Sequence, residues 1–169
     1  MSEWKEIQAE SMGKTPFELI GRDWMLITAQ KKDGSINTMT ASWGGLGVLW
    51  NKNVAFVVIR PQRYTKEFVD EAETLSLSFF DETYKKQLGY LGKVSGRDED
   101  KIKQSGLTVA DNETAPYFEE AKTVLLCKKL FVQEMQKDAF LDDAIIKNWY
   151  PEEDYHILYV AEIEKVLEK

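Results

Sequence analysis

Apolar residues cluster along the chain in short runs of strand length, and polar turn residues separate the runs. Residues 24–29 and 36–43 are rich in β-branched and aromatic side chains, and they flank an Asp33-Gly34 pair. Because Asp-Gly between two such runs is a strong hairpin signal, we expect these segments to pair antiparallel. Residues 53–60 form an almost unbroken apolar run before a proline, which predicts a strand that is covered on both faces.

The period of the apolar pattern then changes from that of a strand to that of a helix. Tyr64, Phe68 and Ala72 recur at helical spacing, so a short amphipathic helix is predicted to begin near residues 63–65. Residues 74–80 alternate polar and apolar side chains again, which predicts a half-buried strand.

The second half of the chain repeats this mixture of strands and short helices. Asp81 is the predicted N-cap of a helix through Leu88, and we expect the glycines that follow to weaken or end that helix. The other expected elements are a polar helix opened by a capping-box pattern at 95–98 and running to Lys103, turns over 105–116, a strand over 122–135 bent at Lys128-Lys129, a helix over 142–149 stopped by Pro151, and a strand over 155–163.

Together these elements predict a mainly β fold. About six or seven strands joined by hairpins and short helices favour a closed or nearly closed antiparallel barrel over the alternative, a doubly wound parallel sheet. The glycine-rich residues 43–50 match neither G-x-G-x-x-G nor the P-loop pattern, so we expect a tight corner between strands there instead of a phosphate site. No repeat or linker divides the chain, which predicts a single domain over 1–169.

Composition narrows the classes of function. The 169 residues carry 22 Lys and Arg against 29 Asp and Glu, a net charge of −7, which argues against nucleic acid as a partner. One Cys and one His cannot build a zinc site or a disulfide framework, which leaves a carboxylate metal site or a Cys–His pair as self-contained chemistry. We therefore expect a group bound from outside to carry any reaction, with no metal.

Two further expectations concern location and the single cysteine. The chain has no run of the roughly 20 apolar residues that cross a bilayer, and its first ten residues are acidic and polar, unlike a signal peptide. We therefore expect a soluble, cytoplasmic protein with no membrane partner. Cys127 lies within an apolar run and is interpreted as a buried, structural residue.

An anion site is predicted where strand 53–60 ends and the next helix begins. Arg60 and Arg63 flank this junction, Thr65 adds a hydroxyl, and a helix N-terminus offers free backbone N–H groups. Guanidinium groups suit bidentate contact with phosphate. The alternative is that Thr65 only caps the helix while both arginines pair with surface carboxylates.

A second candidate site is the strand over residues 37–43. Its hydroxyls and amide stand among small and apolar side chains, an arrangement that suits the edge of a flat heteroaromatic ligand, with Trp43 or Phe79 as a wall. The alternative is an ordinary threonine-rich strand.

The ordered set of motifs closely resembles the flavin reductase-like, flavoredoxin-type proteins. The resemblance rests on TMTASWGG at 38–45, VAFVVIRPQRYT at 54–65, LSLSFF at 75–80, GKVSGRD at 92–98, and the tail from Trp149-Tyr150-Pro151 through His156 to Ile163. It covers nearly the whole chain. It implies a split β-barrel, antiparallel and Greek-key-like with short flanking helices, and a homodimer that binds FMN near the subunit interface.

The resemblance also implies which residues contact the flavin. The strand residues would lie along the isoalloxazine, largely through backbone groups, the strand-to-helix junction would hold the ribityl phosphate, two aromatic residues would lie near the ring, and a loop would close over it. These sets are, in that order, Thr38, Met39, Thr40, Ala41, Ser42 and Trp43; Arg60, Gln62, Arg63, Tyr64 and Thr65; Phe79 and Phe80; and Lys93, Ser95, Gly96 and Arg97.

Two motifs separate this chain from many flavin reductases of the same fold. Those proteins carry a Thr-Val-Asn-type strand and a Ser-x-x-x-x-Thr phosphate signature, whereas this chain has Thr-Ala-Ser-Trp and Arg-Pro-Gln-Arg-Tyr-Thr. The difference favours the flavoredoxin-like branch over a dedicated NAD(P)H:flavin reductase.

The expected function is that of an FMN-dependent oxidoreductase. Electrons would pass from NAD(P)H or a protein donor through bound FMN to an acceptor, with the protein supplying binding, orientation and electrostatics. The alternatives are a pyridoxamine phosphate oxidase-like enzyme and a flavin-binding module without turnover. We expect His156 to be a hydrogen-bonded core or interface residue, with protonation of reduced flavin or a substrate as its alternative role.

Overall fold

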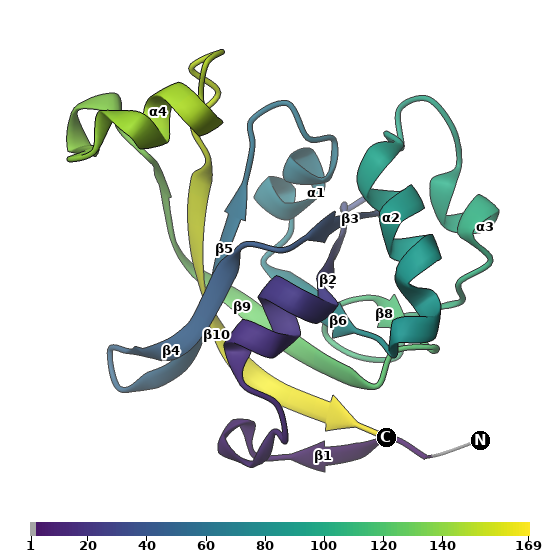
Figure 1. Cartoon of the computed structure of the whole chain (residues 1–169). Coiled ribbons are helices and arrows are strands. Elements are labelled where there is room, and N and C mark those ends of the chain that lie inside the picture. Colours follow the sequence, from purple (N-terminus) through teal and green to yellow (C-terminus); the bar gives the residue numbers. More distant parts are fainter. Residues whose placement is uncertain (1–2) are drawn as a thin grey trace.

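The computed structural model describes residues 3–169, and its main element is a strongly curved antiparallel sheet with short helices outside it (Figure 1). Eight strands form this sheet, in the order β3-β2-β6-β9-β10-β5-β4, and β1 pairs with β10. Their bounds are β1 Lys5–Ile7, β2 Met25–Gln30, β3 Ile36–Ala41, β4 Gly44–Leu49, β5 Lys52–Ile59, β6 Thr74–Phe79, β9 Thr123–Glu134 and β10 Ile157–Glu168. The predicted antiparallel architecture is confirmed.

The sheet stays open between its first and last strands. β3 and β4 follow each other in the chain yet stand at opposite ends of the strand order, so no ladder joins them among the described residues. Ser42 and Trp43 bridge this seam, and they carry the chain from the end of β3 to the start of β4. The seam leaves room for a ligand site, which a fully paired barrel of this size would fill with side chains.

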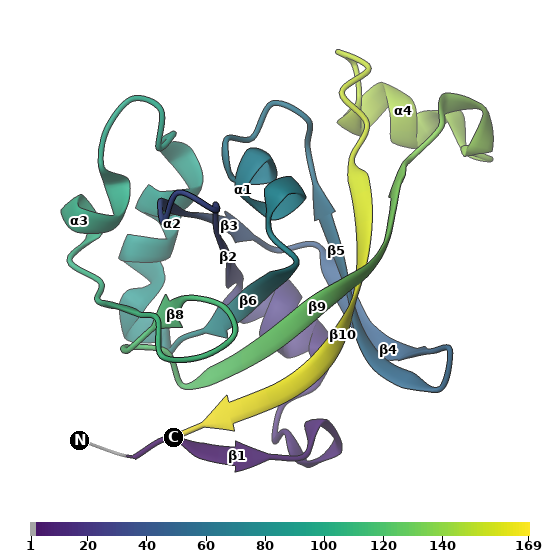
Figure 2. The same ribbon diagram turned by 180° about the vertical axis from the view of Figure 1, so that it is seen from behind.

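The remaining elements are short and lie around the sheet. α4 stands apart at the far end of β9 and β10, as the view from behind shows (Figure 2). The helices are η1 Ala9–Ser11, the π-helix η2 Phe17–Asp23, α1 Thr65–Glu71, η3 Glu82–Tyr84, α2 Lys85–Lys93, α3 Lys101–Ser105, η4 Lys137–Ala139 and α4 Asp143–Trp149, and a small sheet pairs β7 Val109–Ala110 with β8 Tyr117–Phe118.

Two apolar clusters pack on the two faces of the central strands. Ile27 and Leu77 belong to the cluster inside the curved sheet, whereas Leu26 and Leu126 belong to a second cluster with α2 and the segment 107–121. β6 is therefore buried on both faces, and the expectation of a half-buried strand over 74–80 is wrong. Ser76 and Ser78 are buried as well, and the Ser76 hydroxyl donates to the Pro116 carbonyl oxygen.

The hairpin predicted around Asp33-Gly34 is confirmed. β2 and β3 pair from Met25 opposite Ala41 to Gln30 opposite Ile36. Gly34 has φ of +88°, a conformation that glycine adopts without strain.

The glycine-rich segment forms a strand as well as the expected corner. β4 pairs with β5 throughout, and a two-residue turn with positive φ at Trp50 and Asn51 joins the two strands. The corner lies at Gly44, where φ is +138° and a Cβ atom would stand 2.5 Å from the carbonyl oxygen of Phe56. Glycine has little strand propensity, so the pattern alone pointed only to the corner.

The long strand β9 bends where its pattern predicts a bend. Its register against β10 shifts between Lys129 and Phe131, which leaves Leu130 as a bulge. The helix over 142–149 is also confirmed, with the Asp142 carboxylate accepting from the N–H of Ala144. β10 is longer than expected and continues to Glu168.

The expected helix from 95 to 103 begins later than its pattern predicts. Ser95 and Asp98 close a turn instead, because the Ser95 carbonyl accepts the N–H of Asp98 and its hydroxyl accepts that of Arg97. Asp100 caps α3, accepting from the N–H of Lys103. Asp81 caps the short η3 turn that leads into α2, and α2 continues through both of its glycines to Lys93.

No helix within residues 3–169 is long and apolar enough to cross a bilayer.

Candidate functional site

A hollow of about 270 Å³ opens at the seam of the sheet, and we call it the seam hollow. The end of β3, the link to β4, the end of β5 and the end of α4 all contribute to it. It is lined by Met39, Thr40, Ala41, Ser42, Trp43, Val58, Arg60, Arg63, Trp149 and His156. The two candidate sites of the sequence, the 37–43 strand and the arginine-bearing junction, therefore meet in one place.

Three aromatic rings form one wall of the seam hollow. The Trp43 ring meets the Trp149 ring edge-on at 5.1 Å between centroids, and the His156 ring stands 5.2 Å from Trp43. Trp43 is 39% exposed and Trp149 is 52% exposed, so neither ring is fully covered. Large, half-open aromatic surfaces of this kind suit stacking with a planar ligand.

His156 lies in the same wall and is only 7% exposed. Its Nδ1 atom forms a 2.7 Å hydrogen bond with the Tyr150 hydroxyl. Burial lowers the pKa of His156 to about 4, and the positive charge of Arg60 adds to this effect against the opposing charge of Asp154. The imidazole is therefore neutral at physiological pH.

Arg60 is already held by the protein. Its guanidinium pairs with the Asp154 carboxylate at 2.9 Å and donates to the Trp149 carbonyl oxygen at 2.9 Å. Gln62 donates to the same carboxylate at 2.7 Å. For Arg60, the alternative interpretation of pairing with a carboxylate is confirmed, and this pairing fixes α4 against the end of β5.

Arg63 is the uncompensated cation of the seam hollow. Its Nη1 atom donates to the Gly92 carbonyl oxygen at 3.1 Å, and within residues 3–169 no carboxylate lies within ion-pair distance of it. Burial lowers the pKa of this guanidinium, although arginine stays charged at any physiological pH. Arg63 is half-buried, and a partly desolvated positive charge without a counterion favours an anionic ligand.

Two of the backbone N–H groups at the start of α1 are used inside the protein and do not contribute to the expected anion site. Those of Lys66 and Glu67 donate to the carbonyl oxygens of Arg63 and Tyr64 at 3.1 Å each. Thr65 neither caps the helix nor faces solvent, because it is buried and its hydroxyl accepts from the Asn37 amide at 3.1 Å. That hydrogen bond ties the junction to β3 and thereby brings the two candidate sites together.

Two strand threonines also use their hydroxyls inside the protein. Thr38 is fully buried and donates to the Ile27 carbonyl oxygen at 3.0 Å, and Thr40 donates to the Leu88 carbonyl oxygen of α2. Thr38 is therefore a core residue outside the seam hollow. Besides the exposed Ser42 hydroxyl, the polar groups that residues 40–42 offer to a ligand are backbone groups.

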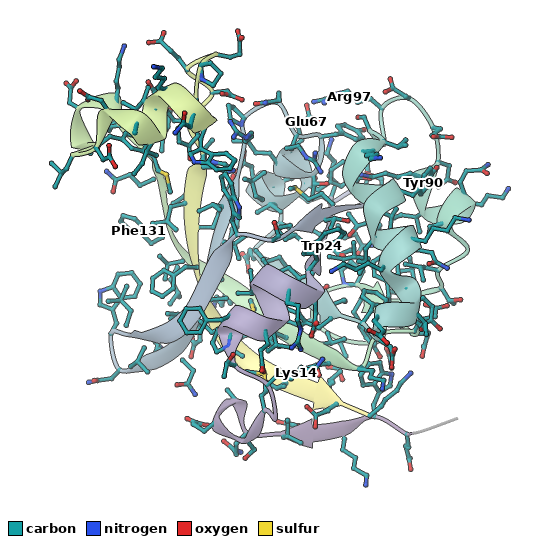
Figure 3. All side chains as sticks on the ribbon, in the orientation of Figure 1. Lys14, Trp24, Glu67, Tyr90, Arg97 and Phe131 are labelled. Atoms are coloured by element: carbon teal, nitrogen blue, oxygen red, sulfur yellow. The ribbon has the colours of Figure 1, made fainter. Side chains whose placement is uncertain are left out.

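The loop over residues 93–97 packs against the junction. A Cβ atom on Gly96 would stand 2.5 Å from the Asn37 amide oxygen, so any larger residue here would have to displace the buried Asn37 side chain. The Arg97 guanidinium stacks over the Tyr64 ring at 4.6 Å, donates to the Gln62 carbonyl oxygen at 3.2 Å and faces Glu67 at 3.5 Å; Figure 3 labels Arg97 and Glu67 side by side. Ser95 lies on the same loop and Lys93 is the last residue of α2, and both are outside the lining of the seam hollow.

A buried lysine holds the base of this loop. Lys101 of α3 donates to the carbonyl oxygens of Leu91 and Val94 at 2.9 Å each, where α2 ends. Burial lowers its pKa to about 8, and the charge of Arg63 contributes. Sequence reasoning missed Lys101 and Asp154 as residues of this region, because each acts through a distant partner that no local pattern reveals. Asn37, Trp149 and Tyr150 lie in segments that the sequence pointed to, but their partners Thr65, Trp43 and His156 were not predicted.

Phe79 and Phe80 do not reach the seam hollow. Both are buried and line a separate hollow of about 640 Å³ with Asp81, Lys122 and other charged residues. Several of the charges there pair with each other, as Lys14 does with Asp23 at 2.7 Å and Lys122 does with Asp81 at 2.8 Å. In this chain the wall expected from Phe79 is formed instead by Trp149, whose side chain lies beside Trp43.

Comparison with known proteins identifies the family. A model of the flavin reductase like domain matches residues 17–169, whereas no curated protein matches the chain. Solved structures with the same fold include three that cover 98% of this chain. They are an FMN-binding domain of a flavin reductases-like enzyme from Shewanella baltica (TM-score 0.70, 14% identity, 77% of that chain), flavoredoxin of Desulfovibrio vulgaris (0.67, 20%, 76%) and an FMN-binding protein from Thermus thermophilus with bound p-hydroxybenzaldehyde (0.66, 21%, 82%).

The family match and the fold agree with each other. The antiparallel sheet with an open seam is the split barrel that the resemblance implied. The chain therefore belongs to the family of flavin reductase-like domains.

Proposed function

We propose that the seam hollow binds FMN and that the protein is an FMN-dependent oxidoreductase. The observation that carries this proposal is the meeting, in one hollow, of half-open aromatic rings and the uncompensated cation Arg63. A planar ring and a phosphate are the two ends of one FMN molecule, and the hollow offers a surface for each. The family match and the FMN-binding neighbours support the same cofactor.

The residues present fit the phosphate end of FMN. Arg63 would hold the phosphate through the guanidinium N–H groups that Gly92 does not use. Arg60, Gln62, Tyr64 and the 93–97 loop would shape the surrounding surface, since their contacts with Asp154 and Arg97 fix them in place. Thr65 would contribute to phosphate binding indirectly, by holding the Asn37 side chain beneath the 93–97 loop.

The residues present also fit the ring end. Trp43 and Trp149 would bound the isoalloxazine, and backbone groups of residues 40–42 would face its polar edge. Bound flavin accepts electrons singly or as a hydride, which is chemistry that no side chain here supplies. His156 is the one titratable side chain of the wall, and in its neutral form it would donate a hydrogen bond without adding charge.

A second copy of the chain would complete the site. The seam hollow is open and smaller than a flavin needs, which supports a cofactor shared with a partner surface. Apolar side chains gather near the β4–β5 turn, where Val48 is 70% exposed and the Trp50 ring lies 6.2 Å from that of Phe131. Phe131 points away from the barrel in Figure 3. Exposed apolar surface of this kind supports a homodimer.

The electron donor in this proposal is NAD(P)H or a reduced protein. The Thermus thermophilus neighbour was solved with bound p-hydroxybenzaldehyde and with 1-cyclohex-2-enone. Small ring carbonyls are therefore reasonable acceptors to test alongside free flavin and protein partners.

Anaerobic reduction tests the proposed activity. Protein loaded with FMN should lose its oxidised-flavin absorption within seconds of mixing with NADH or NADPH, and an added acceptor should restore it. Loss without restoration would indicate another acceptor. Flavin that binds and stays oxidised with both nucleotides would support a binding module or a protein donor, and displacement of FMN by pyridoxal phosphate would favour the pyridoxamine phosphate oxidase-like alternative.

A further inference from the structure

Only one of the two ring nitrogens of His156 forms a hydrogen bond within the described residues. Nδ1 is bonded to the Tyr150 hydroxyl at 2.7 Å, and among residues 3–169 no side chain or backbone group is bonded to Nε2. His156 lines the seam hollow, so a ligand there is the partner that Nε2 can reach. Whether Nε2 carries a proton decides whether the wall offers a hydrogen-bond donor or an acceptor.

Tyr150 is fixed in a position from which it can determine the protonation of the His156 ring. Its backbone N–H donates to the Ile146 carbonyl oxygen at 2.8 Å, which fixes it at the end of α4. The Arg60 guanidinium lies 5.0 Å from the Tyr150 ring centroid, and the Tyr155 ring packs beside it at 5.1 Å. The residue is buried, and this packing keeps its hydroxyl oxygen beside the imidazole.

The hydroxyl has a clear preference for donating to His156. Its other neighbour is the Met135 sulfur at 3.9 Å, and a thioether is a much weaker acceptor than an imidazole nitrogen. Burial raises the pKa of Tyr150, so the phenol keeps its proton. A phenol can donate to Nδ1 only if Nδ1 is unprotonated, and in a neutral imidazole the proton must then be on Nε2.

We propose that Tyr150 is a positioning residue that holds neutral His156 in the Nε2-protonated tautomer and so makes it a hydrogen-bond donor toward the seam hollow. Its significance for a flavin rests on the proposed function, whereas the tautomer itself does not. A donor at this wall stabilises a ligand that becomes richer in electrons, as flavin does on reduction.

The tautomer can be measured directly because His156 is the only histidine of the chain. Long-range proton–nitrogen NMR spectra of ¹⁵N-labelled protein without flavin, at pH 7, report which ring nitrogen is protonated. Wild-type protein should show the Nε2-protonated form. Tyr150→Phe should shift the ratio of tautomers about 2- to 10-fold toward the Nδ1-protonated form, the loss expected for one buried hydrogen bond.

Tyr155→Phe is a matched control. Tyr155 is also buried and belongs to the same aromatic cluster, yet its hydroxyl has no hydrogen-bond partner among residues 3–169. This variant should keep the wild-type tautomer. A wild-type protein in the Nδ1-protonated form would overturn the proposal, and so would an unchanged Tyr150→Phe or an equal shift in both variants.

Flavin-loaded protein provides an independent arm. The reduction potential of bound FMN should fall in Tyr150→Phe relative to Tyr155→Phe, because the donor toward the ring is weakened. Absence of flavin binding in wild-type protein would defeat the proposed function and leave the NMR result standing. A normal tautomer shift with an unchanged potential would show that His156 does not face the ring, which overturns the donor role.

Discussion

Replacing Arg63 with Gln tests the phosphate end of the proposed site. Arg63 is the cation of the seam hollow without a carboxylate partner, and its one internal hydrogen bond goes to the Gly92 carbonyl oxygen at 3.1 Å. Glutamine keeps a donor for that carbonyl while removing the charge. The variant therefore isolates the charge-assisted contact with a ligand.

The magnitude follows from the type of contact. A hydrogen bond to a charged group contributes about 1.5–3 kcal/mol, so the Kd for FMN should rise about 10- to 150-fold. Riboflavin has the same ring and ribityl chain without the phosphate. Its Kd should therefore stay within about twofold of the wild-type value.

Titration of flavin fluorescence measures both constants. Arg22→Gln is the matched control, because Arg22 pairs with Asp23 on a different surface and should affect neither ligand. Thermal unfolding of each variant without flavin checks that the fold is intact. If Arg63→Gln weakened the binding of FMN and of riboflavin equally, the assignment of Arg63 to the phosphate would be refuted. A residue that binds only the phosphate cannot affect riboflavin, which has no phosphate group.

Three further predictions concern stability and reactivity. Gly96→Ala should lower the free energy of unfolding by about 1–3 kcal/mol because its Cβ would meet the Asn37 amide oxygen, whereas Gly13→Ala, with open space around it, should not, as denaturant titration can show. Because His156 has a pKa of about 4 when folded and about 6.5 when unfolded, stability should fall by up to about 3 kcal/mol as pH drops from 6.5 to 4; His156→Gln should flatten that part of the profile, and an unchanged slope would contradict the buried neutral state. Burial raises the pKa of the Cys127 thiol, so a thiol reagent at pH 8 should modify it only after unfolding, as mass spectrometry would record.

Much of the fold could be predicted from local patterns. The unbroken apolar run predicts β5, and the Asp33-Gly34 pair predicts the β2–β3 hairpin. Both signals lie within a few residues of sequence, so they can be recognised without the structure. β4 could not be predicted because its glycines are explained by packing against the Phe56 ring, which lies on the neighbouring strand β5. α3 was misplaced because Ser95 bonds within its own turn instead of capping a helix.

The candidate site shows the same division between local and distant signals. Arg63 and Trp43 were identified from their motifs, and both line the seam hollow. The long-range partners of the neighbouring residues Arg60 and Thr65 could not be identified in that way: Asp154 binds Arg60 across 94 positions of sequence, and Asn37 binds Thr65 across 28. Phe79 is an aromatic residue that the sequence predicts as a wall for a flat ligand, but it lies at the end of β6 and packs in the core.

The central claim, that the seam hollow binds FMN, is tested most directly by gel filtration of the purified protein after incubation with excess FMN. FMN should co-elute with the protein near one flavin per chain, with quenched fluorescence and a visible spectrum shifted from that of free FMN. Elution of all the flavin in the small-molecule fraction, with an unaltered spectrum, would contradict the claim.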